Sequence, residues 1–227
     1  MSNYIEQWKK VGLSDNFVFQ KVMENTDLCK EVLERILNVK LSKVETVTTE
    51  KVIEDIYQSK GIRVDAYVED SLGTIYNVEA QTYEISDVLP KRIRYYQSCI
   101  DLNLLLKGHD YSQLKDVFII FICNFDPIGL EYSQYRFKTI SPDNHQIVLD
   151  DGRTIILLNS HGNDENLNQG LRNFLKLFNG HKVEGDDLID CWIKQLTKLS
   201  KGVTVVWNGL VDNVIYRIKD VWAGKKE

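Results

Sequence analysis

The sequence of 227 residues has little of what marks a disulfide scaffold, a zinc protein or a membrane protein. Its four cysteines lie far apart with no CxxC pair, and its four histidines are equally scattered, with no HExxH motif. We therefore expect buried free thiols in a reducing compartment. No apolar run approaches the roughly 20 residues that span a bilayer, and the N-terminus lacks the apolar core of a signal peptide. These absences predict a cytoplasmic protein with no membrane partner.

The chain also has only three prolines, and it contains no internal repeat, low-complexity segment or Pro/Ser-rich linker. Its 43% hydrophobic and 27% charged residues are typical of a soluble globular protein. We predict one domain over residues 1–180 and a mainly helical C-terminal extension over residues 181–227, whose structure the pattern leaves open. The formal net charge of −5 argues against nucleic-acid binding through the whole surface but permits a local basic face.

Two alternating segments in the middle of the chain predict a β-hairpin. The alternation in residues 62–69 places Ile62, Val64, Ala66 and Val68 on one face. Residues 74–82 alternate again, and there Ile75, Asn77, Glu79 and Gln81 share a face. A three-residue loop with Gly73 at its left-handed position would pair Asp70 with Thr74. Counting back along both strands then puts Asp65 opposite Glu79.

The predicted pairing brings two carboxylates together. Directly opposed residues have Cβ atoms roughly 4.5–5.5 Å apart on the same face, and like charges there repel. A divalent cation held between Asp65 and Glu79 would offset the repulsion. Alternatively, both lie on a solvated outer face, with Arg63 or Lys60 supplying a weak ion pair. The alternation alone fits both interpretations.

The remaining segments predict helices and strands in an α/β order. Helices are expected at residues 13–23, capped by Ser14, at 26–37, at 87–107 with Pro90 in the first turn and a stop at Gly108, and at 163–178 and 186–199. Strands are expected at 44–49, before a polar loop over 50–59, at 116–125, and as a second hairpin of 146–149 with 154–158. The sheet should therefore be mixed.

The helix after the hairpin carries basic and aromatic residues within one and a half turns, namely Lys91, Arg92, Arg94, Tyr95, Tyr96 and Gln97. Lys and Arg neutralise a phosphate backbone and Tyr hydroxyls donate hydrogen bonds to it. The alternative is an amphipathic helix with apolar and Tyr side chains in the core and hydrated charges. Similarly, Glu31 and Glu34 of an earlier helix could reach a metal centre or simply face solvent.

Several of these segments, in their order and spacing, resemble the PD-(D/E)XK nuclease superfamily. The resemblance rests on GIRVDAYVED, YNVEAQ and LPKRIRYYQSCIDLNLLLKGHDYSQLKDVFIIFICNFDP, preceded by LSDNFVFQKVM and LCKEVLERIL. It is specifically to the recombination-promoting nucleases, also described as PD-(D/E)XK nuclease family transposases, and it covers residues 13–179. It implies a restriction-endonuclease-like α/β core, a mixed central sheet flanked by helices, and cleavage of DNA with Mg²⁺, for which Mn²⁺ can substitute.

The resemblance also implies roles for individual residues. Asp65 would be the first carboxylate ligand of the metal, Glu79 the second, and the Ala80 carbonyl a further ligand. Gln81 stands at the position of the motif's lysine, where it can orient water by hydrogen bonding but supplies no positive charge. Secondary candidates for holding the phosphate or supporting the ligands are Glu31, Arg92, Tyr96 and Gln97.

Three functions follow as hypotheses. The first is a metal-dependent DNA endonuclease, for which a homodimer would suit double-strand cutting although the sequence shows no interface. The second is a catalytically weak relative that works as a nucleic-acid-binding or protein-interaction module, because the motif lysine is missing and the net charge is negative. The third is a nuclease that cuts RNA. The C-terminal sequence KGVTVVWNGLVDNVIYRIKDVWAGKKE departs from the charged helix expected of the family.

Overall fold

A computed structural model describes residues 13–54, 60–163, 167–187 and 189–190 of the chain. Its centre is one six-stranded sheet with the strand order β1-β2-β3-β4-β6-β5. The strands are β1 Val44–Ile53, β2 Ile62–Asp70, β3 Ile75–Gln81, β4 Val117–Cys123, β5 Gln134–Phe137 and β6 Arg153–Asn159. The helices are α2 Asn16–Met23, α3 Thr26–Leu37, α4 Leu89–Leu104, the short 3₁₀ helix η1 Tyr111–Gln113, and α5 Gln169–Phe178.

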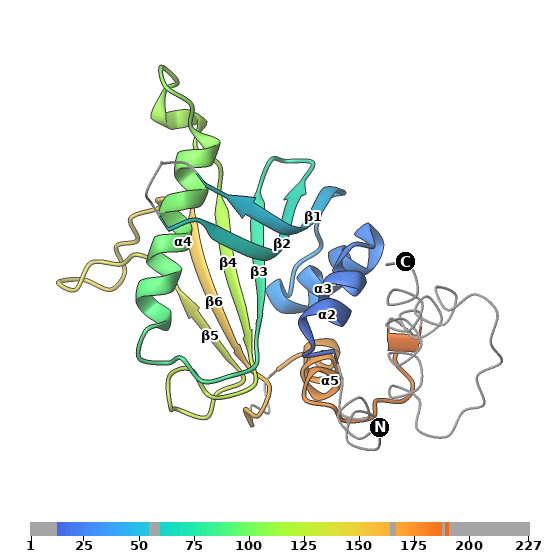
Figure 1. The fold of residues 1–227 in the computed structure, drawn as a ribbon. Helices are drawn as coiled ribbons and strands as arrows, with labels where there is room; N and C mark the ends of the chain where they lie inside the picture. Colours follow the sequence, from blue (N-terminus) through green and yellow to red (C-terminus); the bar gives the residue numbers. More distant parts are fainter. Residues whose placement is uncertain (1–12, 55–59, 164–166, 188, 191–227) are drawn as a thin grey trace.

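The sheet is mixed, as the sequence predicts. Strands β1, β2 and β3 pair antiparallel, β3, β4 and β6 pair parallel, and β5 adds an antiparallel edge to β6. Parallel neighbours need a long crossover, and α4 lies within the connection from β3 to β4. Helices flank both faces of the sheet (Figure 1). The α/β class with a mixed central sheet is therefore confirmed.

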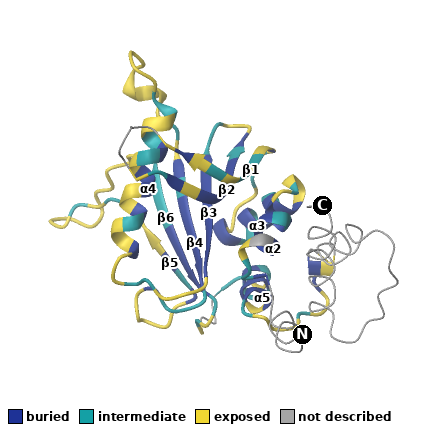
Figure 2. Cartoon of the chain, in the orientation of Figure 1, coloured by how far each residue is buried: buried dark blue, intermediate teal, exposed yellow. Residues whose placement is uncertain are grey.

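Two apolar cores lie on opposite faces of the sheet. The α3-side core joins α2, α3 and α5 to residues such as Ala66, Val78 and Ile120. The α4-side core joins α4 to residues such as Ile119 and Phe121. Strands β3 and β4 are buried on both faces and are dark blue almost throughout in Figure 2. Burial on both faces explains why β4 is a nearly unbroken apolar run.

Three of the four cysteines lie in these cores or against them. Cys29 and Cys123 are buried and unbridged, and burial raises the pKa of each thiol to about 12. Cys99 is half-buried, and Cys191 lies outside the described residues. None of the described helices has the length and hydropathy of a membrane span.

Some element boundaries differ from the predicted ones. Helix α2 begins at Asn16, and its cap is Asp15 rather than Ser14, because the Val18 N–H donates to Asp15 Oδ1 at 3.3 Å. Strand β1 continues to Ile53 through residues expected to form a loop, since pairing with β2 outweighs their polar composition. Helix α4 ends at Leu104, three residues before the predicted end.

The second predicted hairpin is wrong. Strand β6 pairs with β4 and with β5, whereas Val148 forms an isolated bridge with Ile140. The run Ile155–Leu158 is a buried interior strand, so nonlocal pairing replaces the nearest turn. Helix α5 begins at Gln169 with Asn168 as its N-cap, later than predicted. The predicted helix at 186–199 is described only at its start, and the tail beyond residue 190 lies outside the described residues.

Strand β2 does not keep one face throughout, contrary to the predicted alternation. Ile62 and Val64 belong to the α4-side core, whereas Ala66 and Val68 belong to the α3-side core. The reversal occurs at Asp65, and across the sheet the neighbouring residue of β1 is Glu50, whose φ of +51° lies in the left-handed region. The alternating side chains of β2 therefore exchange faces of the sheet at Asp65, the buried carboxylate.

Candidate active site

The carboxylate pair lies where β2 and β3 separate. The hairpin has the predicted register: the Asp70 N–H donates to the Thr74 carbonyl at 3.1 Å, and Gly73 has a φ of +84°. The ladder then runs back to its last pair, Ala66 and Val78. Asp65 and Glu79 follow directly, so these residues are opposite each other beyond the end of regular pairing.

Side chains replace the missing ladder bonds. The Asp65 N–H donates to Glu79 Oε1 at 3.1 Å, and the Ala80 N–H donates to Asp65 Oδ2 at 3.0 Å. Each carboxylate thus accepts a backbone hydrogen bond from the opposite strand. The arrangement fixes both side chains with neutral donors and leaves their like charges close together.

The pair is buried, which overturns the interpretation of a solvated outer face. Asp65 is 7% exposed, Glu79 2% and Gln81 3%. Burial raises the pKa of Asp65 above its ordinary value. Burial, together with the charge of Asp65, raises the pKa of Glu79 to about 8, although Arg92 and a backbone hydrogen bond oppose the shift. Both ionised forms are costly in this environment, which is the condition under which a cation binds favourably.

Helix α4 places one arginine against the pair. Arg92 donates through Nη2 to Glu79 Oε2 at 3.1 Å and to the Tyr96 hydroxyl at 2.8 Å. Its guanidinium also lies over the rings of Tyr96 and Phe121, at 5.0 and 5.2 Å from their centroids. The spacing of Arg92 and Tyr96 by four residues puts both on the sheet-facing side of the helix. The basic turn of α4 therefore contributes a fixed positive charge to the site.

Gln81 is oriented by two partners. Its Oε1 accepts from Arg92 Nη1 at 2.9 Å, and its Nε2 donates to the Tyr83 carbonyl at 2.7 Å. The side chain lies on the same face of β3 as Glu79, beneath α4, as the alternation predicts. An amide held in this way presents one further N–H and one further lone pair.

Sequence reasoning missed Gln20. This α2 residue is 7% exposed, and its Nε2 lies 3.5 Å from Asp65 Oδ1. In the sequence, Gln20 and Lys21 both stand between the apolar Phe19 and Val22, so the pattern shows neither which of them is buried nor which strand it faces. The side chain of helices α2 and α3 that contacts the carboxylates is therefore Gln20, rather than Glu31 or Glu34.

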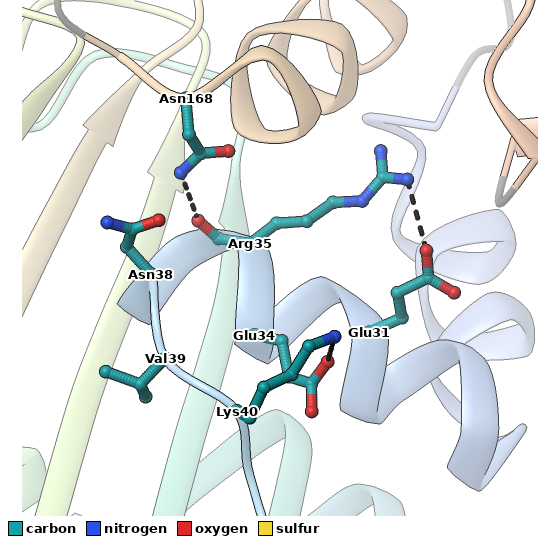
Figure 3. Close-up of a pocket in the computed structure, with 7 residues that line it drawn as sticks. All are labelled: Glu31, Glu34, Arg35, Asn38, Val39, Lys40 and Asn168. Carbon is teal, nitrogen blue, oxygen red and sulfur yellow. Dashed lines mark hydrogen bonds and ion pairs between the residues drawn. The ribbon is translucent and has the colours of Figure 1, made fainter.

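Two of the secondary candidates lie elsewhere. Glu31 pairs with Arg35 at 3.2 Å and lines a pocket beside the C-terminal half of α3, with its side chain 46% exposed (Figure 3). In the same pocket Lys40 binds Glu34 at 2.7 Å. Gln97 lies farther along α4, where its Nε2 donates to Asp101 Oδ1 at 2.8 Å. The structure thus brings together Asp65, Glu79, Ala80, Gln81, Arg92 and Tyr96.

The donor set fits a hard divalent cation. Each of the four oxygens of Asp65 and Glu79 accepts one N–H from the described residues, which leaves a second lone pair on each. The N–H and carbonyl of a strand residue face the same neighbour, so the Ala80 carbonyl points into the gap where β2 has separated. No cluster of three or more His, Cys, Asp or Glu side chains suited to a metal occurs in the described ranges. Two carboxylates, a carbonyl and waters are a set that suits Mg²⁺.

Basic side chains surround this buried centre. Arg63 of β2 is 63% exposed, and its charge acts on both carboxylates. Lys91 and Arg94 are exposed on α4 on either side of Arg92, and Lys60 is exposed just before β2. An acidic centre with exposed Lys and Arg around it is complementary to a metal ion and a polyanion together.

The family comparison gives one match. The model of the family described as PD-(D/E)XK nuclease family transposase matches residues 14–204. The matched range includes the whole hairpin and α4. Comparison with curated proteins and with solved structures gives no match.

Proposed function

The chain belongs to the PD-(D/E)XK nuclease family transposases, and on that premise we propose that it is a metal-dependent endonuclease that hydrolyses DNA phosphodiester bonds. The observation that carries the proposal is the buried pair Asp65 and Glu79, each held by a backbone N–H of the other's strand. Structural cores do not normally place two carboxylates together without a cation or a paired base. A metal-dependent nuclease needs such a pair of carboxylates to hold its cation.

The chain's residues divide the work. Asp65, Glu79 and the Ala80 carbonyl would hold Mg²⁺ or Mn²⁺, and Gln20 would keep Asp65 in place. Gln81, fixed by Arg92 and the Tyr83 carbonyl, would orient the attacking water with its remaining hydrogen-bonding groups. The bound cation supplies Lewis acidity, lowering the pKa of a water and stabilising the charge on the phosphoryl oxygens.

DNA is the proposed substrate. The family description names a nuclease and transposase, and the exposed Lys60, Arg63, Lys91 and Arg94 lie near the carboxylates or on the helix that carries Arg92. Arg and Lys contacts to phosphates bind a backbone without reading sequence. We therefore propose little sequence preference and binding that weakens steeply with salt. Cutting both strands needs two sites, so we also propose a homodimer, which light scattering on the DNA complex would reveal.

Supercoiled plasmid DNA provides the test. Wild-type protein and Asp65→Ala are incubated with plasmid over a titration of Mg²⁺ or Mn²⁺, and nicked and linear products are followed. We expect products only with wild type and only with metal. Circular dichroism checks that the variant is folded, and RNA of the same sequence tests the alternative substrate. A folded wild type that binds DNA but cuts neither nucleic acid would favour the non-catalytic binding module.

A further inference from the structure

The candidate site contains a positive charge that does not come from the lysine position of the family motif. The third motif residue of this chain is the neutral Gln81, so no lysine stands there. Arg92 of α4 reaches the same place from the other side, with its Nη1 bound to Gln81 Oε1 at 2.9 Å. We propose that Arg92 takes over the lysine's role and binds the phosphate group that is cut. The inference rests on the proposed phosphodiesterase function and adds the group that binds the phosphate.

The hydrogen bonds of Arg92 leave room for such a ligand. A guanidinium has five N–H donors. Three of them are used: two from Nη2, to Glu79 and Tyr96, and one from Nη1, to Gln81. Among the described residues none accepts from Nε or from the second hydrogen of Nη1. Two donors are therefore available, one on Nε and one on Nη1. They lie on different sides of the guanidinium, so each can donate a single charge-assisted hydrogen bond to a phosphate oxygen.

The Arg92 side chain is also partly exposed, and its guanidinium is held in place. The Arg92 side chain is 30% exposed, whereas its partner Glu79 is 3% exposed. Contacts with the rings of Tyr96 and Phe121 fix the plane of the group. Arg92 thus lies between the buried carboxylates and solvent, and a phosphate oxygen bound by one of its two available N–H groups would lie near the groups proposed to hold the cation. A charge held in advance at this place stabilises negative charge that develops during cleavage.

This role differs from that of a simple salt bridge. If Arg92 only neutralised Glu79, its removal would change metal affinity and fold stability but not phosphate binding. If it binds the phosphate, its loss weakens DNA binding and slows cleavage even when metal is saturating. The positive charge could then be supplied from the motif position instead, by a lysine at residue 81.

The experiment compares four variants with wild type: Arg92→Gln, Arg92→Lys, the double variant Gln81→Lys with Arg92→Gln, and Lys107→Gln. Lys107 is an exposed basic residue beyond the C-terminal end of α4 and serves as the control for the loss of one positive charge. Binding of a fluorescent DNA duplex is measured by anisotropy with Ca²⁺ replacing Mg²⁺, Mn²⁺ affinity by calorimetry, and plasmid cleavage at saturating Mg²⁺.

For Arg92→Gln we expect duplex affinity at least about fivefold weaker, Mn²⁺ affinity unchanged or tighter, and cleavage slower by about 10²-fold. Arg92→Lys should be intermediate, and the double variant should recover at least about tenfold of the lost rate. Lys107→Gln should stay within about twofold of wild type. If Arg92→Gln behaves like Lys107→Gln, or if saturating metal alone restores it, the inference is wrong while the nuclease stands. If wild type binds DNA without cutting, the nuclease proposal fails, and weaker duplex binding by Arg92→Gln still supports the phosphate contact.

Discussion

Glu79 accepts a hydrogen bond from the backbone of Asp65, and the Asp65 carboxylate accepts one from Ala80, the next residue after Glu79. These two bonds hold the strands together at the point where the sheet ladder ends. They also hold two buried carboxylates close enough for the charge of Asp65 to raise the pKa of Glu79. The hydrogen bonds that connect β2 and β3 at this point therefore also keep two carboxylates of like charge close together.

The repulsion between Asp65 and Glu79 predicts that removing the charge of Asp65 keeps or raises stability but lowers activity. In Asp65→Asn the amide oxygen still accepts from Ala80, the Gln20 amide can turn to match, and the repulsion with Glu79 is gone. In EDTA we expect the free energy of unfolding to stay equal or rise by about 1 kcal/mol, while metal-dependent cleavage falls at least about 10²-fold. Urea denaturation and the plasmid assay measure the two effects.

Glu69→Gln is the control for Asp65→Asn. Glu69 lies on the same strand, four residues away, but its side chain is 34% exposed and pairs with Lys115. Because a partly exposed ion pair contributes little, both stability and cleavage should change only slightly. A loss of more than about 2 kcal/mol in Asp65→Asn would show that the negative charge is needed for folding, contrary to this account.

The backbone conformation of Glu50, which lies opposite the reversal of β2, predicts that glycine is more stable than glutamate at residue 50. Glu50 has a φ of +51°, a conformation that costs a non-glycine residue roughly 1 kcal/mol. Glu50→Gly should therefore raise the free energy of unfolding by about 0.5–1 kcal/mol. Thr48→Gly, at an exposed position on the same strand, should lower it by about the same amount. The free energy of unfolding of both variants is measured by urea denaturation. Equal destabilisation by the two substitutions would contradict the prediction.

Asn77 predicts a stabilising core substitution. Its side chain is 0% exposed, and neither its oxygen nor its nitrogen has a partner among the described residues. Leucine is close in shape and has no polar group to bury, so Asn77→Leu should raise the free energy of unfolding by about 1–2 kcal/mol. Thermal and urea denaturation measure the effect. A destabilised variant would mean that the amide makes an interaction in the native protein that the described contacts do not include.

Local patterns predicted much of this fold. Helix α3 has the predicted bounds because an apolar stripe follows an Asn cap, and the hairpin has the predicted register because Gly73 permits the left-handed loop residue. The apolar run of β4 predicted an interior strand. In each case a few adjacent residues determine the structure.

The features that the sequence did not predict depend on contacts between residues far apart in the chain. Strand β6 pairs with β4 and β5 rather than with its nearest neighbour in sequence, and Gln20 meets Asp65 across 45 residues. The contact of Arg92 with Gln81 depends on how α4 packs on the sheet. The reversal at Asp65 lies opposite the positive φ of Glu50 on another strand. Alternation along one strand carries no information on any of these contacts.

The ion pair of Asp186 and Arg35 predicts how stability depends on pH. Arg35 donates to both oxygens of Asp186, at 2.7 and 2.8 Å. Burial alone would raise the pKa of Asp186, but hydrogen bonds from Arg35 and Asn173 outweigh it and lower the pKa to about 2. An unfolded aspartate titrates near 3.9, so between these values the unfolded state binds more protons and stability falls as the pH decreases. The pair should contribute about 2 kcal/mol at pH 7, most of which is lost by about pH 2.

Asp186→Asn isolates this contribution from other titrating groups. Its deficit relative to wild type, measured by urea denaturation, should be about 2 kcal/mol at pH 5 and above and should shrink steadily between pH 5 and 2. Glu31→Gln removes the other carboxylate on Arg35, which is 46% exposed, and should cost less than about 0.5 kcal/mol because surface ion pairs are weak. A deficit for Asp186→Asn that stays constant down to pH 2.5 would mean that packing, rather than the charge of Asp186, links α3 to the segment after α5.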